Sequence, residues 1–76
     1  MSLADGLALA DMRTACRSGS AREARQAAGL ALAEVGRIVG VTPRAVALWE
    51  TGRRNPTGPP ALAYAKLLRS LQKKAA

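Results

Sequence analysis

Arginine and lysine are the most distinctive side chains of this 76-residue sequence. Twelve Lys and Arg stand against five Asp and Glu, which gives a formal net charge of +7, while His is absent and Cys16 is the single cysteine. These residue types supply neither the ligands of a zinc site nor a nucleophile paired with a base, so we expect no enzyme, no metal and no cofactor. Guanidinium and ammonium groups bind phosphates, and the expected partner is a polyanion.

The positive charge is concentrated in the second part of the chain. Residues 1–30 carry a net charge of +1 and residues 31–76 a net charge of +6. No apolar run reaches the roughly 18 residues needed to span a bilayer, and residues 1–10 lack the basic start of a secretion signal. The lone Cys16 suits a reducing compartment and a packing role. We therefore expect a cytoplasmic protein with no membrane partner and no small-molecule ligand.

Alanine-rich composition predicts a small helical protein. The hydrophobic fraction is 49%, and Trp49 and Tyr64 are the two aromatic residues. Small apolar side chains favour helices that pack closely, and a chain of this length makes one domain, residues 1–76. The expected fold class is all-α, a compact bundle of about five short helices.

The first helix is expected over residues 2–17. One stripe of this helix is formed by Leu3, Leu7, Ala10 and Thr14, with Leu9, Met12 and Cys16 nearby. The simplest role for the stripe is to cover the core of the domain. The alternative is a dimerisation surface, for which Tyr64 and Leu67 of the last helix are further candidates.

Local signals place the second and the last helix. Ser20 and Glu23 fit a capping box, in which a hydroxyl and a carboxylate satisfy backbone donors, and this predicts a helix over residues 21–28. After a connection rich in Gly and Pro, apolar residues spaced by three and four predict an amphipathic helix over residues 59–72. Residues 73–76 are expected to form a frayed basic end.

Residues 31–51 predict two short helices joined at Gly40. Gly40 ends the first of them without hindrance from a Cβ atom. Thr42 can cap the second, and Pro43 suits its first position because the N–H there would be unpaired. Buried side chains must flank the turn. They are Val35, Val39, Val41, Val46 and Trp49. Such a pair can place its second helix in the DNA major groove, which admits one α-helix.

The stretch VGRIVGVTPRAVALWETGRRNP, residues 35–56, is similar to the helix-turn-helix domain of the lambda-repressor-like (Xre/Cro) family. The resemblance rests on the Gly-Val-Thr turn, the following Val46, the Trp-Glu-x-Gly run and Pro56. It extends over residues 22–71, about two thirds of the chain. It implies a helix-turn-helix domain over residues 20–71.

The resemblance implies a role for each matched position. The motif core comprises Val35, Gly40, Val41, Val46 and Trp49. The positions that face the bases are Thr42, Pro43, Arg44, Ala47 and Leu48. Arg25 and Glu50 occupy the places of an arginine and a glutamate that pair between the first helix of the domain and the recognition helix. A partly buried ion pair is implied there, which orients more than it stabilises because desolvation offsets the attraction.

Arg44 is the strongest candidate for reading DNA sequence. It lies in the first turn of the helix that would enter the groove, where its guanidinium can bond O6 and N7 of guanine and discriminate by about 1–3 kcal/mol. The alternative is a surface arginine at a phosphate. Ala47 permits close approach, and Leu48 can meet a thymine methyl. Phosphate contacts through side chains and backbone amides are expected from Arg53, Arg54 and Asn55, with a solvated turn as the alternative.

Three residues or pairs depart from the family pattern. Ala31 and Leu32 stand where a Ser or Thr followed by a DNA-contacting Gln is common, which leaves the exposed amides of the helix start as the phosphate site. Gly36 replaces the alanine that is usual at the helix crossing, and it costs roughly 0.5–1 kcal/mol of helix propensity. Leu48 stands where a polar or basic residue is common.

These features predict a DNA-binding transcriptional regulator, a small Cro-like repressor of phage or bacterial origin that acts by promoter occlusion. The expected partner is double-stranded DNA with an operator-like inverted repeat, bound by a homodimer at least on DNA. One alternative is a protein-binding or antitoxin-type module, marked by an exposed patch of Leu3, Leu7 and Leu9. The other is an architectural DNA binder without sequence specificity, whose affinity arises from counterion release.

Overall fold

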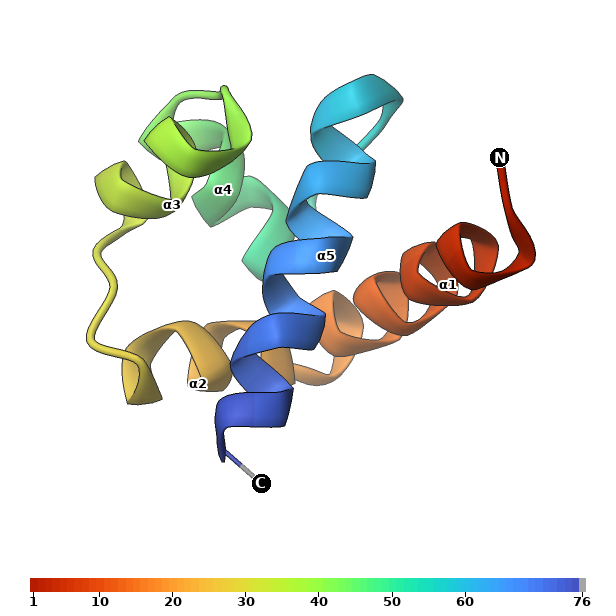
Figure 1. Cartoon of the computed structure of the whole chain (residues 1–76). Coiled ribbons are helices and arrows are strands. Elements are labelled where there is room, and N and C mark those ends of the chain that lie inside the picture. The colour runs from red at the N-terminus through yellow and green to blue at the C-terminus, as the bar shows by residue number, and fades with distance from the viewer. Residues whose placement is uncertain (76) are drawn as a thin grey trace.

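The computed structural model describes residues 1–75, which form five helices and no strand (Figure 1). The helices are α1 (Leu3–Ser18), α2 (Ser20–Ala27), α3 (Leu32–Val39), α4 (Pro43–Glu50) and α5 (Gly58–Ala75). The all-α class predicted from the sequence is therefore confirmed. None of the helices within the described range is long and apolar enough to cross a membrane.

Helix α5 is the centre of the arrangement. It packs against α1, α2 and α3, while α4 packs mainly on α3. In Figure 1, α5 descends through the middle of the molecule, with α3 and α4 at the upper left, α2 at the lower left and α1 at the right. The N-terminal helix, which lies outside the family resemblance, thus packs along the same helix that supports the motif.

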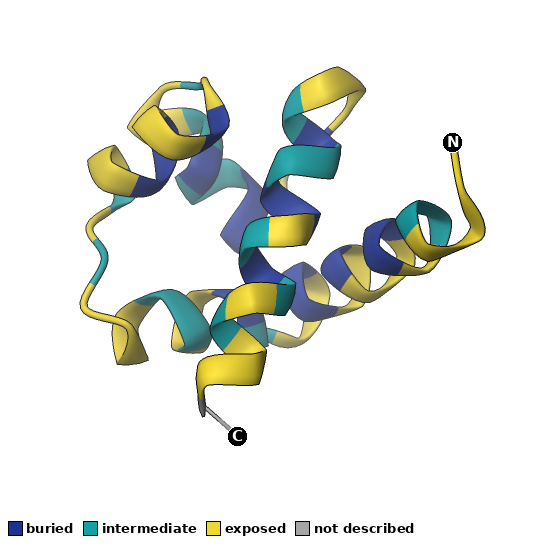
Figure 2. Cartoon of the chain, viewed as in Figure 1, coloured by how far each residue is buried: buried dark blue, intermediate teal, exposed yellow. Residues whose placement is uncertain are grey.

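The buried residues lie where the helices face one another (Figure 2). They are small and branched side chains around two aromatic rings. The rings of Trp49 and Tyr64 lie with their centroids 4.9 Å apart and tilted by 44°, a separation at which aromatic pairs attract. The buried apolar residues are Ala8, Leu9, Met12, Ala15, Cys16, Ala21, Val35, Val39, Val46, Trp49, Ala61, Tyr64, Ala65 and Leu68. Four of the five helices contribute several of these residues, so the core joins α1 to the motif through α5.

Helix α1 covers the core, as expected, with Leu9, Met12 and Cys16 buried, but the stripe of Leu3, Leu7, Ala10 and Thr14 lies on the opposite face. Leu3 and Leu7 are 80% and 54% exposed, and Ala10 and Thr14 are exposed as well. The covering face consists of Ala8, Leu9, Met12, Ala15 and Cys16. Because apolar residues occur on both sides of this helix, their spacing permits either face to be buried. The expected exposed patch therefore lacks Leu9.

The junction between α1 and α2 corrects the expected capping box. Gly19 alone turns the chain, with a left-handed φ of +89°, and Ser20 is already the first residue of α2. Its cap residue is Gly19, which has no side chain, and the Ser20 N–H donates to Ser18 Oγ at 3.3 Å. The Ser20 hydroxyl instead accepts a hydrogen bond from Ser18 Oγ at 3.1 Å, and the Glu23 N–H donates to the Gly19 carbonyl at 3.2 Å. A one-residue turn leaves no position for a separate cap.

Helix α5 is longer than expected at both ends. It begins at Gly58, one residue before the expected start at Pro59, and it continues to Ala75, so residues 73–75 are helical and not frayed. Ala76 lies outside the described residues. The connection before α5 is exposed at residues 51–55 and at Thr57, but Pro56 is fully buried. Pro56 thus anchors the α4–α5 connection in the core, although the whole connection was predicted to lie on the surface.

Tyr64 and Cys16 are neutral core residues. Burial raises the pKa of the Tyr64 hydroxyl and of the Cys16 thiol, because desolvation disfavours their charged forms. The Tyr64 hydroxyl has no hydrogen-bond partner among the described residues. Tyr64 is 1% exposed, and Leu67 packs half-buried against the core. Tyr64 therefore offers no dimerisation surface, whereas part of Leu67 stays accessible.

Candidate nucleic-acid interface

A tight backbone crossing joins α3 to α4. Gly40 adopts a left-handed φ of +88°, and the N–H groups of Gly40 and Val41 both donate to the Gly36 carbonyl at 2.8 Å. A Cβ atom on Gly36 would lie 2.6 Å from the Val41 carbonyl oxygen, which leaves no room for a side chain. Val41, expected in the motif core, is half-buried against it.

The start of α4 forms as the sequence predicts. The Thr42 hydroxyl accepts a hydrogen bond from the Ala45 N–H at 3.1 Å, and Pro43 occupies the first helical position. This cap satisfies one donor of the first turn. Thr42, Pro43 and Arg44 are all exposed, so three of the five residues implied to face bases are open to solvent at one end of α4.

The other side of α4 is firmly packed. Val35, Val46 and Trp49 are 1%, 0% and 4% exposed, as expected for the motif core. Ala47 and Leu48 are half-buried. These two residues are thus less accessible than Thr42, Pro43 and Arg44.

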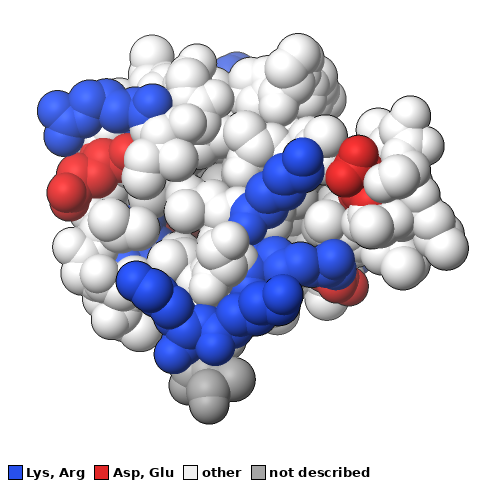
Figure 3. All heavy atoms as spheres, in the orientation of Figure 1, with Lys and Arg blue, Asp and Glu red and all other residues white. Residues whose placement is uncertain are grey.

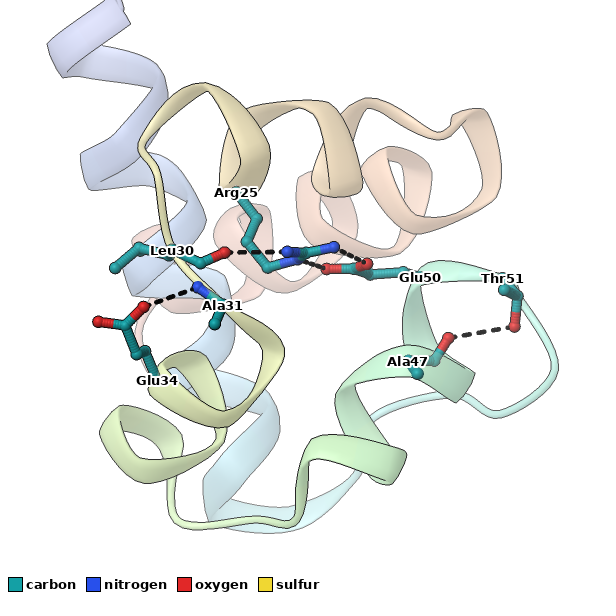
Figure 4. A network of polar contacts seen from close by, with 7 residues as sticks. All are labelled: Arg25, Leu30, Ala31, Glu34, Ala47, Glu50 and Thr51. Carbon is teal, nitrogen blue, oxygen red and sulfur yellow. Dashed lines mark hydrogen bonds and ion pairs between the residues drawn. The ribbon is translucent and has the colours of Figure 1, made fainter.

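An ion pair fixes α4 to α2 (Figure 4). Arg25 Nε lies 2.6 Å from Glu50 Oε2, and Arg25 Nη2 donates to Glu50 Oε1 at 3.1 Å. The side chains are 12% and 4% exposed, so the pair expected between the two helices is present and nearly buried. Two parallel bonds of this kind define a geometry as well as an attraction.

The same arginine also holds the segment that leads to α3. Arg25 Nη1 donates to the Leu30 carbonyl at 2.9 Å. The hydrogen bonds to Glu50 raise the pKa of Arg25 further, so the guanidinium stays charged. One side chain therefore links α2, the α2–α3 connection and the end of α4. The Leu30 contact was missed from the sequence, since a backbone carbonyl leaves no signature in residue type.

The segment after α4 offers side chains for phosphate contacts. Arg53, Arg54 and Asn55 are exposed. The backbone N–H groups of Arg53 and Arg54, however, donate to the Leu48 carbonyl at 3.0 and 3.3 Å. These two amides close the end of α4 and are engaged, which corrects the expectation that they reach phosphates. Arg53 and Arg54 can therefore contact phosphates through their guanidinium groups and not through their backbone amides.

The start of α3 is not the open phosphate site that the sequence suggested. Glu34 Oε1 accepts a hydrogen bond from the Ala31 N–H at 2.8 Å. A carboxylate at this helix end takes the place that an anion would occupy and repels a phosphate. Glu34 lies three residues after the cap position, so the capping-box spacing is the signal that could have revealed this bond.

Basic side chains are not confined to the motif. Figure 3 shows Lys and Arg over the C-terminal half of α5. The basic residues of that helix are Lys66, Arg69, Lys73 and Lys74. Arg69 Nη2 lies 2.9 Å from Asp11 Oδ2 on α1, in an exposed pair that contributes little to stability. The charge expected on the second part of the chain thus covers two separate regions.

The two short helices α3 and α4 thus cross at Gly36 and Gly40, and α4 begins with a capped and exposed first turn. This arrangement defines a helix-turn-helix DNA-binding domain. The family model described as helix-turn-helix matches residues 22–72. The chain belongs to this lambda-repressor-like family, which consists of DNA-binding regulatory domains and not of enzymes. No curated protein and no solved structure matches the chain. The protein is a DNA-binding helix-turn-helix regulator.

Proposed function

We propose that this protein is a small Cro-like repressor that reads duplex DNA with α4 and represses by occluding a promoter. The observation that carries the proposal is the placement of Arg44. It is exposed in the first turn of a helix whose start is capped by Thr42 and whose end is tied to α2 by Glu50. The helix that carries Arg44 is fixed at both ends, and from this position the Arg44 guanidinium can form the bidentate contact to guanine that discriminates between bases.

The neighbouring residues support a division of labour along α4. Thr42 and Pro43 accompany Arg44 at the exposed helix start, while Ala47 and Leu48 offer small apolar contacts one turn later. Arg53 and Arg54 carry guanidinium groups beyond the helix end, where phosphate contacts would set the register of the protein on the duplex. Asn55 extends the same surface.

The proposed target is an inverted repeat bound by two copies in the cytoplasm of a bacterial or phage-infected cell. One short recognition helix covers few base pairs, so domains of this kind gain selectivity by pairing half-sites about one helical turn apart. A bound pair would compete with polymerase for the promoter.

Selection of bound duplexes from a random DNA pool tests this proposal. We would run the selection at about 150 mM salt, which suppresses loosely held complexes, with the wild type, Arg44→Ala and Lys73→Ala. The two variants remove one positive charge each, from the start of α4 and from the far end of α5. We expect an enriched inverted repeat for the wild type and Lys73→Ala. In Arg44→Ala the guanine preference should relax by roughly 5- to 150-fold.

Two other results would replace the proposal with a different function. Retained binding without any enriched motif identifies an architectural DNA binder, which relies on counterion release. A wild-type protein that binds no duplex favours a protein-binding module, for which the exposed Leu3 and Leu7 are the specific structural indication. An enriched motif that is unchanged in Arg44→Ala would leave a specific regulator but remove Arg44 as the base-reading residue.

A further inference from the structure

One side of α4 faces away from the core. Four residues at positions i, i+3, i+4 and i+7 of the helix and its C-cap share this side. They are Arg44, Ala47, Leu48 and Thr51. Among the described side chains, Ala47 and Leu48 belong neither to the core nor to the half-buried residues that pack against it. We call these four residues the recognition face, because a major groove that receives α4 would meet this side.

The free hydrogen-bond donors of the recognition face belong to Arg44. The Thr51 hydroxyl donates to the carbonyl oxygens of Ala47 and Leu48, each at 3.2 Å, and Figure 4 shows it directed back to the Ala47 carbonyl. A hydroxyl has one proton, so Thr51 offers no donor to a base. Ala47 and Leu48 carry C–H groups alone. The face thus combines one guanidinium with an apolar surface.

The recognition face lacks the side chains that read two of the four bases. Adenine is read by Asn or Gln and cytosine by Asp or Glu, whereas Arg or Lys reads guanine and apolar side chains contact the methyl group of thymine. None of the four residues carries an amide or a carboxylate side chain. The one carboxylate of α4, Glu50, is buried and bound to Arg25. The face is therefore suited to guanine and to a thymine methyl group.

Leu48 lies one helical turn after Arg44. Four residues advance an α-helix by about 6 Å, which is close to two base-pair steps of about 3.4 Å each. Leu48 ends in two methyl groups that can bury the methyl group of a pyrimidine, and the small side chain of Ala47 beside it permits close approach. The methyl group that Leu48 contacts is thus expected about two base pairs from the guanine at Arg44.

We propose that Leu48 reads the methyl group of a pyrimidine about two base pairs from the guanine that Arg44 reads. An apolar contact recognises the methyl group and not the polar edge of the base. The protein therefore accepts 5-methylcytosine at this position as it accepts thymine, and its binding responds to cytosine methylation there. The inference rests on the proposed repressor function, because it takes α4 as the helix that reads bases.

Base analogues in the duplex enriched by the selection test the proposal. Each pyrimidine near the guanine of one half-site, on either strand, is made as thymine, uracil, cytosine and 5-methylcytosine. Thymine differs from uracil, and 5-methylcytosine from cytosine, by the methyl group alone. At one position the methylated base of each pair should bind about fourfold more tightly, which corresponds to roughly 0.8 kcal/mol for one buried CH₂ group at about 1.4 kcal/mol per tenfold. Fluorescence anisotropy measures the affinities.

Two variants assign the methyl contact to its residue. Leu48→Ala should bind the thymine and uracil duplexes equally and should keep the preference for guanine. Leu7→Ala makes the same change at an exposed leucine of α1, outside the motif, and should retain the fourfold difference of the wild type. Circular dichroism verifies that both variants fold. The comparison of base analogues uses the wild-type protein, so it decides the proposal even if Leu48→Ala does not fold.

Three results would overturn the proposal. An enriched motif in which no pyrimidine near the guanine shows a methyl effect removes this inference and leaves the repressor proposal intact. A methyl effect that persists in a folded Leu48→Ala variant removes Leu48 as the residue that reads the methyl group. A selection that enriches no motif removes the repressor proposal and this inference together. The failure of the inference alone is thus distinguished from the failure of the proposed function.

Discussion

Gly36 and Gly6 lie inside helices, yet the structure gives them opposite roles. A Cβ on Gly36 would meet the Val41 carbonyl oxygen at 2.6 Å and the Thr42 carbonyl carbon at 3.3 Å. Both neighbours are backbone atoms, which cannot rotate away as a side chain can. A Cβ on Gly6 would meet nothing within 4 Å. At Gly36 a glycine is required because any side chain would clash with the backbone, whereas at Gly6 the glycine only weakens the helix.

We therefore expect Gly→Ala to change stability with opposite signs at these two positions. Gly6→Ala should raise the free energy of unfolding by about 0.5–1 kcal/mol, the propensity difference between the residues. Gly36→Ala gains the same propensity but overpacks the crossing against a backbone oxygen at 2.6 Å, which should cost roughly 2–3 kcal/mol, the upper part of the usual range. It should therefore lower stability by about 1–2.5 kcal/mol. Denaturant unfolding followed by Trp49 fluorescence measures both variants.

A Gly36→Ala variant as stable as the wild type would contradict this account. It would mean that the Gly40–Thr42 turn relaxes freely and accepts the alanine that is usual in the family. The sequence identified Gly36 as a close crossing because the family pattern places a small residue there. It did not reveal that the space is too short for a methyl group, because that distance depends on how α3 and α4 meet.

At the scale of helices, the Arg25–Glu50 pair holds α2 against α4. Arg25→Met should destabilise the protein by roughly 3–5 kcal/mol, because it leaves the Glu50 carboxylate buried without a partner. Replacing both residues with Met should recover most of that loss, since burial of two apolar side chains needs no charge compensation. A chain of this length is stable by about 4–11 kcal/mol in total, so Arg25→Met should remove a large part of the stability and unfold at a clearly lower denaturant concentration than the wild type.

A double-mutant cycle with Arg25→Met, Glu50→Met and the double variant measures this coupling. If orientation is the main role of the pair, the double variant should fold but bind DNA more weakly than the wild type, because the end of α4 loses its two fixed bonds. Single and double variants of equal stability would show that the pair carries no structural constraint.

The helices differ in how well the sequence predicts them. The motif was predictable because Gly40, Thr42 and Pro43 act through local backbone rules and the family pattern covers this stretch. The buried face of α1 was not predictable, because leucines and alanines stand on both sides of the helix. Packing on α5 decides which of the two faces is buried. The Ser20 cap failed for a similar reason, since one left-handed glycine already supplies the whole turn.

At the scale of the whole molecule, positive charge occupies two regions that differ in their distance from the motif. Arg53 lies three residues after the end of α4, whereas Lys73 lies near the far end of α5. Lys73 lies fifteen positions after Gly58, the first residue of α5, a distance of about 22 Å at 1.5 Å per residue. That exceeds the Debye length of about 8–10 Å at physiological salt. The overall charge of +7 thus overstates the charge that a duplex at α4 would meet.

Salt dependence of DNA binding separates these two regions. The logarithm of the binding constant falls with the logarithm of salt concentration by about 0.9 for each phosphate neutralised. Arg53→Gln should reduce this slope by about 0.9 if its guanidinium holds one phosphate, whereas Lys73→Gln, which removes an equal charge, should leave it unchanged. Fluorescence anisotropy with a labelled duplex across about 50–200 mM salt measures both. Equal reductions in the two variants would mean that the duplex also contacts the end of α5, and that binding uses the total charge of the protein.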